Sequence, residues 1–184
     1  LVNNAGILRD KTLINMSESE WDAIMQVHLK GTFVPSKAAC EYWRECEKAG
    51  KPRKGRIINT SSTSGLYGNY GQANYGAAKA GIAAVSVILN AEMDRFGVKV
   101  RTIPPSSSLC LPSCTNAQTD LFGVKVNCIA PAARTRMTEN LGIFAKPKEG
   151  MYDPFSAANI SPTVVYLGSD DCSVGGAVLL VQGP

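Results

Sequence analysis

Apolar residues return at helical spacing along the first part of the chain. From Ser17 onward they recur every three or four positions, as the buried stripe of an amphipathic helix requires, at Trp21, Ile24, Met25, Leu29, Phe33 and Val34. Ser17 and Glu20 have the spacing of a capping box, which predicts the start of the helix. Pro35 leaves the carbonyl four residues back without its helical partner, so a bend or loosened turn is predicted near 28–35. The helix is expected to resume over 38–48.

Short apolar runs alternate with the helical segments and predict strands. A glycine- and asparagine-rich loop over 64–74 leads to a second long helix, from about Tyr75 to Arg95, and a third helix starts at Ser161-Pro162. The predicted strands are Gly55–Ser61, Val124–Ala130 and Gly176–Val181, preceded by the end of a strand within Leu1–Gly6. This alternation indicates an α/β protein with a parallel sheet.

A short duplication interrupts this pattern. The heptad 94–100 recurs at 120–126, with six of seven residues identical, and a stretch rich in Pro, Ser and Cys separates the copies. One copy is enough to end a helix and start a strand. We therefore interpret 101–126 as an insertion in a single domain spanning 1–184, either an exposed loop or an error of splicing or gene modelling, with the error favoured.

Composition narrows the class of protein. The chain has 184 residues, of which 45% are hydrophobic and 18% charged, as expected for one globular domain. The net charge of +4 is spread out, and the basic cluster within 48–56 has no interleaved aromatic residues, so nucleic-acid binding is not expected. No apolar run is long enough to cross a membrane. The six cysteines form no CxxC pair and the chain has one histidine, which argues against a metal site and favours free thiols in the cytoplasm.

Candidate chemistry gathers between Ser62 and Lys79. Tyr75 and Lys79 are four residues apart on a predicted helix, so their side chains share one face. A nearby ammonium lowers the pKa of a phenol and makes it a better acid–base group at neutral pH. Ser62 follows a strand and is placed to hydrogen-bond a substrate carbonyl. Taken singly, these residues are also compatible with a surface Tyr–Lys pair and a Ser/Thr-rich turn.

Further motifs at strand ends complete a recognisable set. They are Asn3-Asn4-Ala5-Gly6, Ser62, the Tyr75-x-x-x-Lys79 pair and a Pro-containing turn at Pro131. With them the sequence resembles the short-chain dehydrogenase/reductases over essentially the whole chain except 101–126. It is most similar to the 3-oxoacyl reductases and to the (3R)-hydroxyacyl-CoA dehydrogenase domains of type 2 peroxisomal multifunctional enzymes.

The resemblance implies a Rossmann-like, doubly wound parallel sheet and roles for individual residues. Tyr75 would exchange a proton with the substrate oxygen, while Lys79 would bind the nicotinamide ribose and lower the pKa of Tyr75. Ser62 would orient the carbonyl. His28 stands where most of the family has asparagine, and would support a water-mediated proton relay. The remaining contacts to NAD or NADP would come from Asn3, Ala5 and Gly6 on the adenosine side, and from Pro131, Ala133 and Thr135 at the carboxamide.

The resemblance also sets the expected function. It implies NAD(P)-dependent interconversion of 3-oxoacyl and 3-hydroxyacyl thioesters, with substrate choice in 134–160. The alternatives are turnover of another ketone or alcohol, such as a steroid, and a non-catalytic fragment or a pseudoenzyme that acts only through association. The family's glycine-rich pyrophosphate turn would precede Asn3, so the sequence is expected to be truncated at its N-terminus. A homo-oligomer is implied, as is a peroxisomal location if the chain is part of a eukaryotic multifunctional enzyme.

Overall fold

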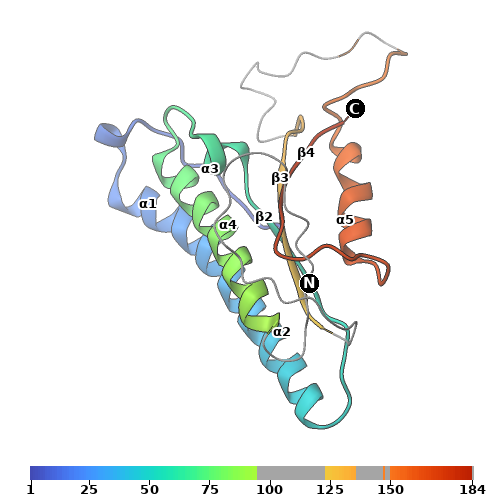
Figure 1. Cartoon of the computed structure of the whole chain (residues 1–184). Helices are drawn as coiled ribbons and strands as arrows, with labels where there is room; N and C mark the ends of the chain where they lie inside the picture. Colours follow the sequence, from blue (N-terminus) through green and yellow to red (C-terminus); the bar gives the residue numbers. More distant parts are fainter. Residues whose placement is uncertain (95–122, 136–146, 148–149, 184) are drawn as a thin grey trace, which may run out of the picture.

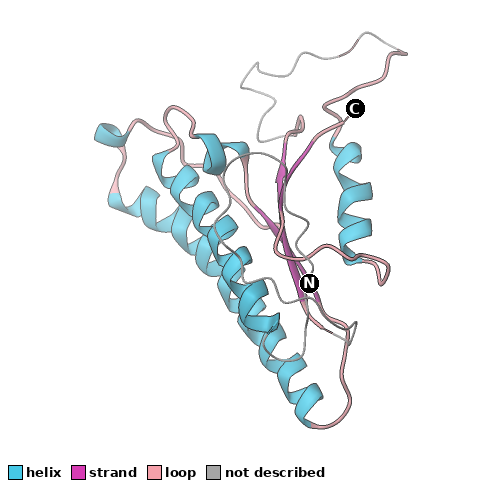
Figure 2. Cartoon of the chain, in the orientation of Figure 1, coloured by secondary structure: helices cyan, strands magenta, loops and turns pink. Residues whose placement is uncertain are grey.

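The computed structural model describes residues 1–94, 123–135, 147 and 150–183. Within these residues four strands form one sheet in the order β1-β2-β3-β4, and each neighbouring pair is parallel. Figure 2 shows the strands in magenta between the helices. The strands are β1 (Val2–Asn3), β2 (Arg56–Thr60), β3 (Lys125–Pro131) and β4 (Val178–Val181). The predicted parallel α/β architecture is confirmed.

Helices cover both faces of the sheet. Figure 1 shows α1, α2 and α4 on one side of the strands and α5 on the other, which is the three-layer arrangement of a doubly wound fold. The helical elements are η1 (Leu13–Asn15), α1 (Glu18–Ile24), η2 (Met25–Lys30), α2 (Gly31–Lys48), α3 (Thr63–Tyr67), α4 (Ala73–Asp94), η4 (Ala157–Ile160) and α5 (Ser161–Gly168).

The core follows from the two-residue period of β2. Ile57 packs on the α2 and α4 side, in a buried cluster with Met93 and Val126. Ile58 points to the opposite face and packs with Leu167 of α5. Burial of a side chain of this size stabilises the fold by roughly 1.5–3 kcal/mol. Alternate residues of one strand therefore hold the two helical layers against the sheet.

The long N-terminal helix begins as predicted, but its irregular turn lies earlier than expected. The Ser17 hydroxyl accepts from the Glu20 amide, and the Glu20 carboxylate accepts from the Ser17 amide, so the predicted capping box is present. The bend was expected at 28–35. The structure instead has a widened π-helical turn at η2, while Pro35 lies inside a regular helix. The two ranges overlap only at 28–30.

Two further segments bear on the predictions. The predicted loop 64–74 contains a short helix, α3, because Ser62 caps it by accepting a hydrogen bond from the Ser64 amide. The second copy of the duplicated heptad supplies the first residues of β3, Lys125 and Val126. Most of the predicted insertion, 101–122, lies outside the described residues, as does much of the segment 134–160 to which substrate choice was assigned.

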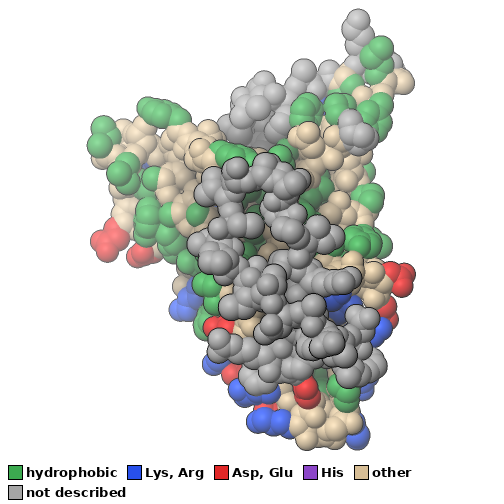
Figure 3. Space-filling model, viewed as in Figure 1, with side chains coloured by type: hydrophobic (Ala, Val, Ile, Leu, Met, Phe, Trp, Pro, Cys, Tyr) green, Lys and Arg blue, Asp and Glu red, His purple; other side chains and the backbone are tan. Residues whose placement is uncertain are grey.

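The basic cluster lies in an exposed connection between α2 and β2. Lys51, Arg53 and Lys54 are solvent-exposed there. Figure 3 shows blue and red side chains mixed at this end of the molecule, which is how a solvated charged surface looks. Among the described residues, no helix combines the length and the apolar character that a membrane crossing requires.

Candidate active site

A cavity of about 510 Å³ opens at the carboxyl ends of the strands, the edge where α/β sheets hold ligands. β2 brings Thr60 to it, and the loop after β2 brings Ser62. The end of β3 brings Pro131, and the turn that follows brings Ala133 and Thr135. The helices and the loop after β1 complete the wall with Gly6, His28, Tyr75 and Lys79. The four predicted catalytic residues therefore line one cavity, although they are as much as 51 positions apart in sequence.

Tyr75 and Lys79 stand on adjacent turns of α4. The Lys79 side chain is almost fully buried, and its Nζ donates a hydrogen bond of 2.6 Å to the Thr60 carbonyl. The same nitrogen lies 5.6 Å from the centre of the Tyr75 ring. The end of β2 thus holds the ammonium group beside the aromatic ring.

The pKa values of this pair differ from the sequence-based expectation. Burial lowers the pKa of Lys79 to about 8, while the neighbouring Cys128 acts in the opposite direction. Burial also raises the pKa of Tyr75. A hydrogen bond with Ser62 acts in the lowering direction, and the Asp10 carboxylate adds to the rise. The Tyr75 pKa therefore shifts upward rather than in the expected direction, because desolvation of the phenolate is the largest cause acting on it.

Ser62 is held by the turn that it starts. Its Oγ accepts a hydrogen bond of 3.2 Å from the Ser64 amide at the beginning of α3. Close packing keeps this helix against α4, because a Cβ on Gly65 would lie 2.7 Å from backbone atoms of Lys79 and Ala80. Glycine at this position therefore allows the Ser62 hydroxyl to reach Tyr75.

His28 is buried in the widened turn η2 and meets Tyr75 edge-on, with ring centres 5.1 Å apart. Its Nε2 lies 2.8 Å from the carbonyl oxygen and 3.1 Å from the amide nitrogen of Ile7. Its Nδ1 is buried and has no hydrogen-bond partner. Burial lowers the pKa of His28, so the ring is neutral at pH 7. Gly6 is required here, since a Cβ would lie 2.7 Å from the imidazole.

Of the three residues at and just after the end of β1 that were expected to contact the cofactor, Gly6 lines this cavity, whereas Asn3 and Ala5 do not. The Asn3 side chain turns away from the cavity and donates hydrogen bonds to Ser36 of α2 and Asn59 of β2. Ala5 is exposed and is not one of the lining residues. Asn4, which the sequence reasoning did not single out, lines the cavity instead. Asn3 is the last residue of β1, and these two hydrogen bonds hold its side chain against α2 and β2.

Thr60 is a second residue that the sequence reasoning missed. Its Oγ1 is buried at the cavity and unpartnered, like the Nδ1 of His28. Buried polar atoms are hydrogen-bonded as a rule. Two such atoms on one cavity indicate that it receives a polar ligand or ordered water. The only signal in the sequence was the position of Thr60 at the polar end of a predicted strand.

Comparison with known proteins places the chain in a family. The family model of short chain dehydrogenases matches residues 1–109. Hydroxyacyl-CoA dehydrogenase ChsB1 of Mycobacterium tuberculosis is 39% identical, and the match covers 100% of this chain and 51% of the relative. The peroxisomal hydratase-dehydrogenase-epimerase of Saccharomyces cerevisiae is 41% identical over 93% of this chain and 15% of its own length.

Solved structures agree with this result. The crystal structure of a short chain dehydrogenase from Mycobacterium avium superposes with a TM-score of 0.74 at 44% identity, covering 99% of this chain and 51% of that one. The 3-oxoacyl-[acyl-carrier-protein] reductase FabG of Thermotoga maritima is 33% identical over 100% of this chain and 64% of its own length. The chain therefore spans 51% of the length of ChsB1 and of the Mycobacterium avium dehydrogenase, and 64% of the length of FabG. It belongs to the short chain dehydrogenase family.

Proposed function

We propose that the protein is an NAD(P)-dependent oxidoreductase that interconverts 3-oxoacyl and 3-hydroxyacyl thioesters. The observation that carries the proposal is the placement of Ser62, Tyr75 and Lys79 on one cavity at the carboxyl end of the sheet. Relatives named as a hydroxyacyl-CoA dehydrogenase and a 3-oxoacyl reductase support this choice of substrate.

The part of the cavity lined by Thr60 and Lys79 suits a nicotinamide cofactor. Lys79 offers a buried ammonium, and Thr60 offers an unpartnered hydroxyl, both suited to the polar groups of a nicotinamide ribose. The turn of Pro131, Ala133 and Thr135 lines the same cavity and would meet the carboxamide. When bound, the nicotinamide supplies or accepts the hydride. Every other step falls to the side chains of the chain itself.

Proton exchange with the substrate oxygen falls to Tyr75. In reduction, the Ser62 hydroxyl donates a hydrogen bond to the carbonyl and the Tyr75 phenol gives up its proton as the alcohol forms. In oxidation the same proton returns to the phenolate. Because burial raises the pKa of Tyr75, the described geometry keeps the phenol protonated near neutral pH, and this is the form that reduction needs.

His28 is proposed to support the resupply of this proton. Its ring is edge-on to Tyr75, and its Nδ1 is a buried polar atom without a hydrogen-bond partner at the same cavity. A water molecule held between such unpartnered groups can pass a proton toward the phenol. Since the ring is neutral at pH 7, it acts as a hydrogen-bonding site rather than as a charge.

A kinetic comparison of two tyrosine variants tests the proposal. Oxidation of NADH or NADPH is followed with a 3-oxoacyl-CoA and with a steroid ketone, for this chain and for any longer natural form of it. Turnover is expected with the thioester, and Tyr75→Phe should lower kcat at least about 100-fold. The control, Tyr166→Phe on α5, should retain wild-type rates. Full turnover by Tyr75→Phe would refute the role of Tyr75.

The same assay separates the alternatives. Preference for the steroid ketone would replace the proposed substrate and leave the mechanism intact. A folded protein that neither turns over any ketone nor changes the fluorescence of NADH or NADPH would support a non-catalytic role instead.

We also propose a homo-oligomer, in the cytoplasm or, as part of a multifunctional enzyme, in the peroxisome. Phe33 and Val34 of α2, and Val87 and Ile88 of α4, are large apolar residues that are about half exposed on neighbouring helices. Exposed apolar surface of this kind marks interaction sites. Sedimentation velocity of the purified protein tests the idea, and a purely monomeric species would refute it. Relatives named as peroxisomal support the second compartment.

A further inference from the structure

Residues 9–11 form a strap that is tied to the start of α4. The buried side chain of Asn74 donates hydrogen bonds to the carbonyls of Arg9, at 3.1 Å, and Glu20, at 3.3 Å. Its Oδ1 accepts from the amide of Tyr75 at 2.7 Å. The residue next to Tyr75 thus fixes the strap and the first turn of α4 to each other.

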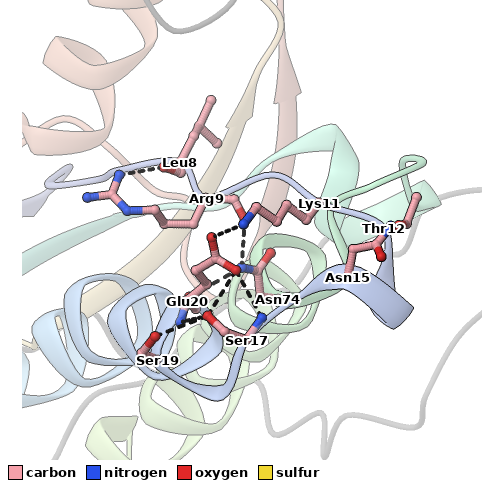
Figure 4. A network of polar contacts seen from close by, with 9 residues as sticks. All are labelled: Leu8, Arg9, Lys11, Thr12, Asn15, Ser17, Ser19, Glu20 and Asn74. Carbon is pink, nitrogen blue, oxygen red and sulfur yellow. Dashed lines mark hydrogen bonds and ion pairs between the residues drawn. The ribbon is translucent and has the colours of Figure 1, made fainter.

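The far end of the strap is fixed to α1. Figure 4 shows the Lys11 ammonium pointing at the Glu20 carboxylate, and the two are 2.8 Å apart. This hydrogen bond is the main reason why the pKa of Glu20 falls to about 2, with the amide and hydroxyl of Ser17 assisting. The strap therefore has attachments to two different helices.

The middle of the strap is held by Gln72, whose side chain is buried and hydrogen-bonded through both its nitrogen and its oxygen. Its Nε2 donates to a carboxylate oxygen of Asp10 at 2.7 Å. Its Oε1 accepts hydrogen bonds from the Ser64 hydroxyl at 2.8 Å and from the side-chain nitrogen of Asn69 at 3.0 Å. The backbone amide of Ser64 in turn donates a hydrogen bond to the Ser62 hydroxyl oxygen. A continuous chain of hydrogen bonds therefore runs from Asp10 to Ser62.

The charged and titratable groups around Tyr75 come from different elements. His28 of η2 is neutral and edge-on to the ring, and Lys79 lies one turn further along α4. Ser62 brings a hydroxyl from the end of β2. Among the described residues acting on the phenol, the negative charge comes from Asp10 in the strap. Gln72 decides where that charge is held.

We propose that Asp10 and Gln72 form a positioning pair for Tyr75, in which Gln72 holds the Asp10 carboxylate in the strap that Asn74 ties to α4 and keeps the Ser62 turn in place. Neither residue belongs to the Ser62, Tyr75 and Lys79 set, and both act through other groups. The inference rests on the proposed function only in treating Tyr75 as the proton donor. The electrostatic arrangement itself can be measured without turnover.

The test is a direct titration of Tyr75. The protein is made with 3-fluorotyrosine, whose phenol ionises at lower pH than that of tyrosine. Its ¹⁹F resonances are followed against pH, and the Tyr75 signal is identified by its loss in Tyr75→Phe. Asp10→Asn keeps an acceptor for Gln72 and removes the charge. The Tyr75 midpoint should fall by roughly 0.2–0.6 pH unit, a modest shift because Asp10 is solvent-exposed.

Three comparisons make the test specific. Asp10→Glu keeps the charge and should leave the midpoint unchanged, as should Asp22→Asn, which removes an exposed charge from α1. Gln72→Met preserves bulk but releases the carboxylate, so the midpoint should fall as it does in Asp10→Asn. High salt should shrink the difference between wild type and Asp10→Asn, which a purely structural effect would not show.

The outcomes separate the two proposals. An unchanged midpoint in folded Asp10→Asn would overturn the positioning pair, whatever the enzyme's activity. A shift in Asp10→Asn without one in Gln72→Met would overturn the role of Gln72 as the tether. Absence of oxidoreductase activity would count against the proposed function alone, since the titration needs neither substrate nor cofactor.

Discussion

Replacing Lys79 with methionine should stabilise the fold while removing a group needed for the proposed reaction. The pKa of this lysine falls from 10.5 to about 8 because burial penalises its charge. Each pKa unit corresponds to about 1.4 kcal/mol, so the buried ammonium costs roughly 3 kcal/mol at neutral pH. Methionine has a similar length and no charge. It loses the hydrogen bond to Thr60, worth about 1–2 kcal/mol, so a net gain of about 1–2 kcal/mol is expected.

The sign of the pH dependence makes this prediction specific. A lysine with a lowered pKa destabilises the folded state below pH 8, and the penalty disappears as pH rises from about 8 to 10.5, because the folded protein releases its proton first. The advantage of Lys79→Met over wild type should therefore shrink by about 2 kcal/mol between about pH 7 and pH 9.5.

Urea unfolding at the two pH values measures this difference directly. The control is Lys37→Met on the exposed surface of α2, whose effect on the free energy of unfolding should not change over the same range. A constant difference between Lys79→Met and wild type across pH would refute the reasoning, since it would mean that Lys79 keeps its ordinary pKa in the folded protein.

Two further predictions concern the supports of the site. Gly65→Ala should destabilise the fold by at least about 1 kcal/mol in the same unfolding assay, because its Cβ would clash with α4. At Gly31 an added Cβ meets only ordinary van der Waals contact, so Gly31→Ala should be neutral or stabilising. Equal effects of the two substitutions would contradict the packing argument. His28 is the chain's only histidine, so its ring signals can be assigned in NMR spectra without further variants. Because burial lowers its pKa, these signals should titrate below pH 6.5, and the free energy of unfolding should decrease as pH falls through that range. A midpoint at or above pH 6.5 would contradict its burial as a neutral ring.

Short-range sequence patterns were sufficient to predict many of the helices and strands. The Ser17–Glu20 capping box and the β-prone run around Ile57 and Ile58 are short-range signals, and the elements that they predicted are present. The meeting of Ser62 and Tyr75 was also foreseeable. In a parallel sheet, strand ends and the helices that follow them share one edge.

Side-chain direction was harder to foresee. Whether Asn3 or Asn4 faces the cavity depends on the phase of β1 against β2, which the sequence motif does not contain. The widened turn around His28 and the short helix after Ser62 depend likewise on contacts with Ile7 and with α4. These contacts join segments far apart in the chain.

The amino-acid sequence by itself determined the class of fold, the family and the residue types available for proton transfer. Tertiary structure alone decided their electrostatics. A lysine four residues from a tyrosine suggests a lowered phenol pKa, yet the folded chain buries both groups, and desolvation dominates the outcome. Likewise, nothing local links Asp10 to Gln72, 62 positions apart, until the fold brings them within 2.7 Å. Burial and long-range contacts belong to the packed chain, and no sequence motif contains them.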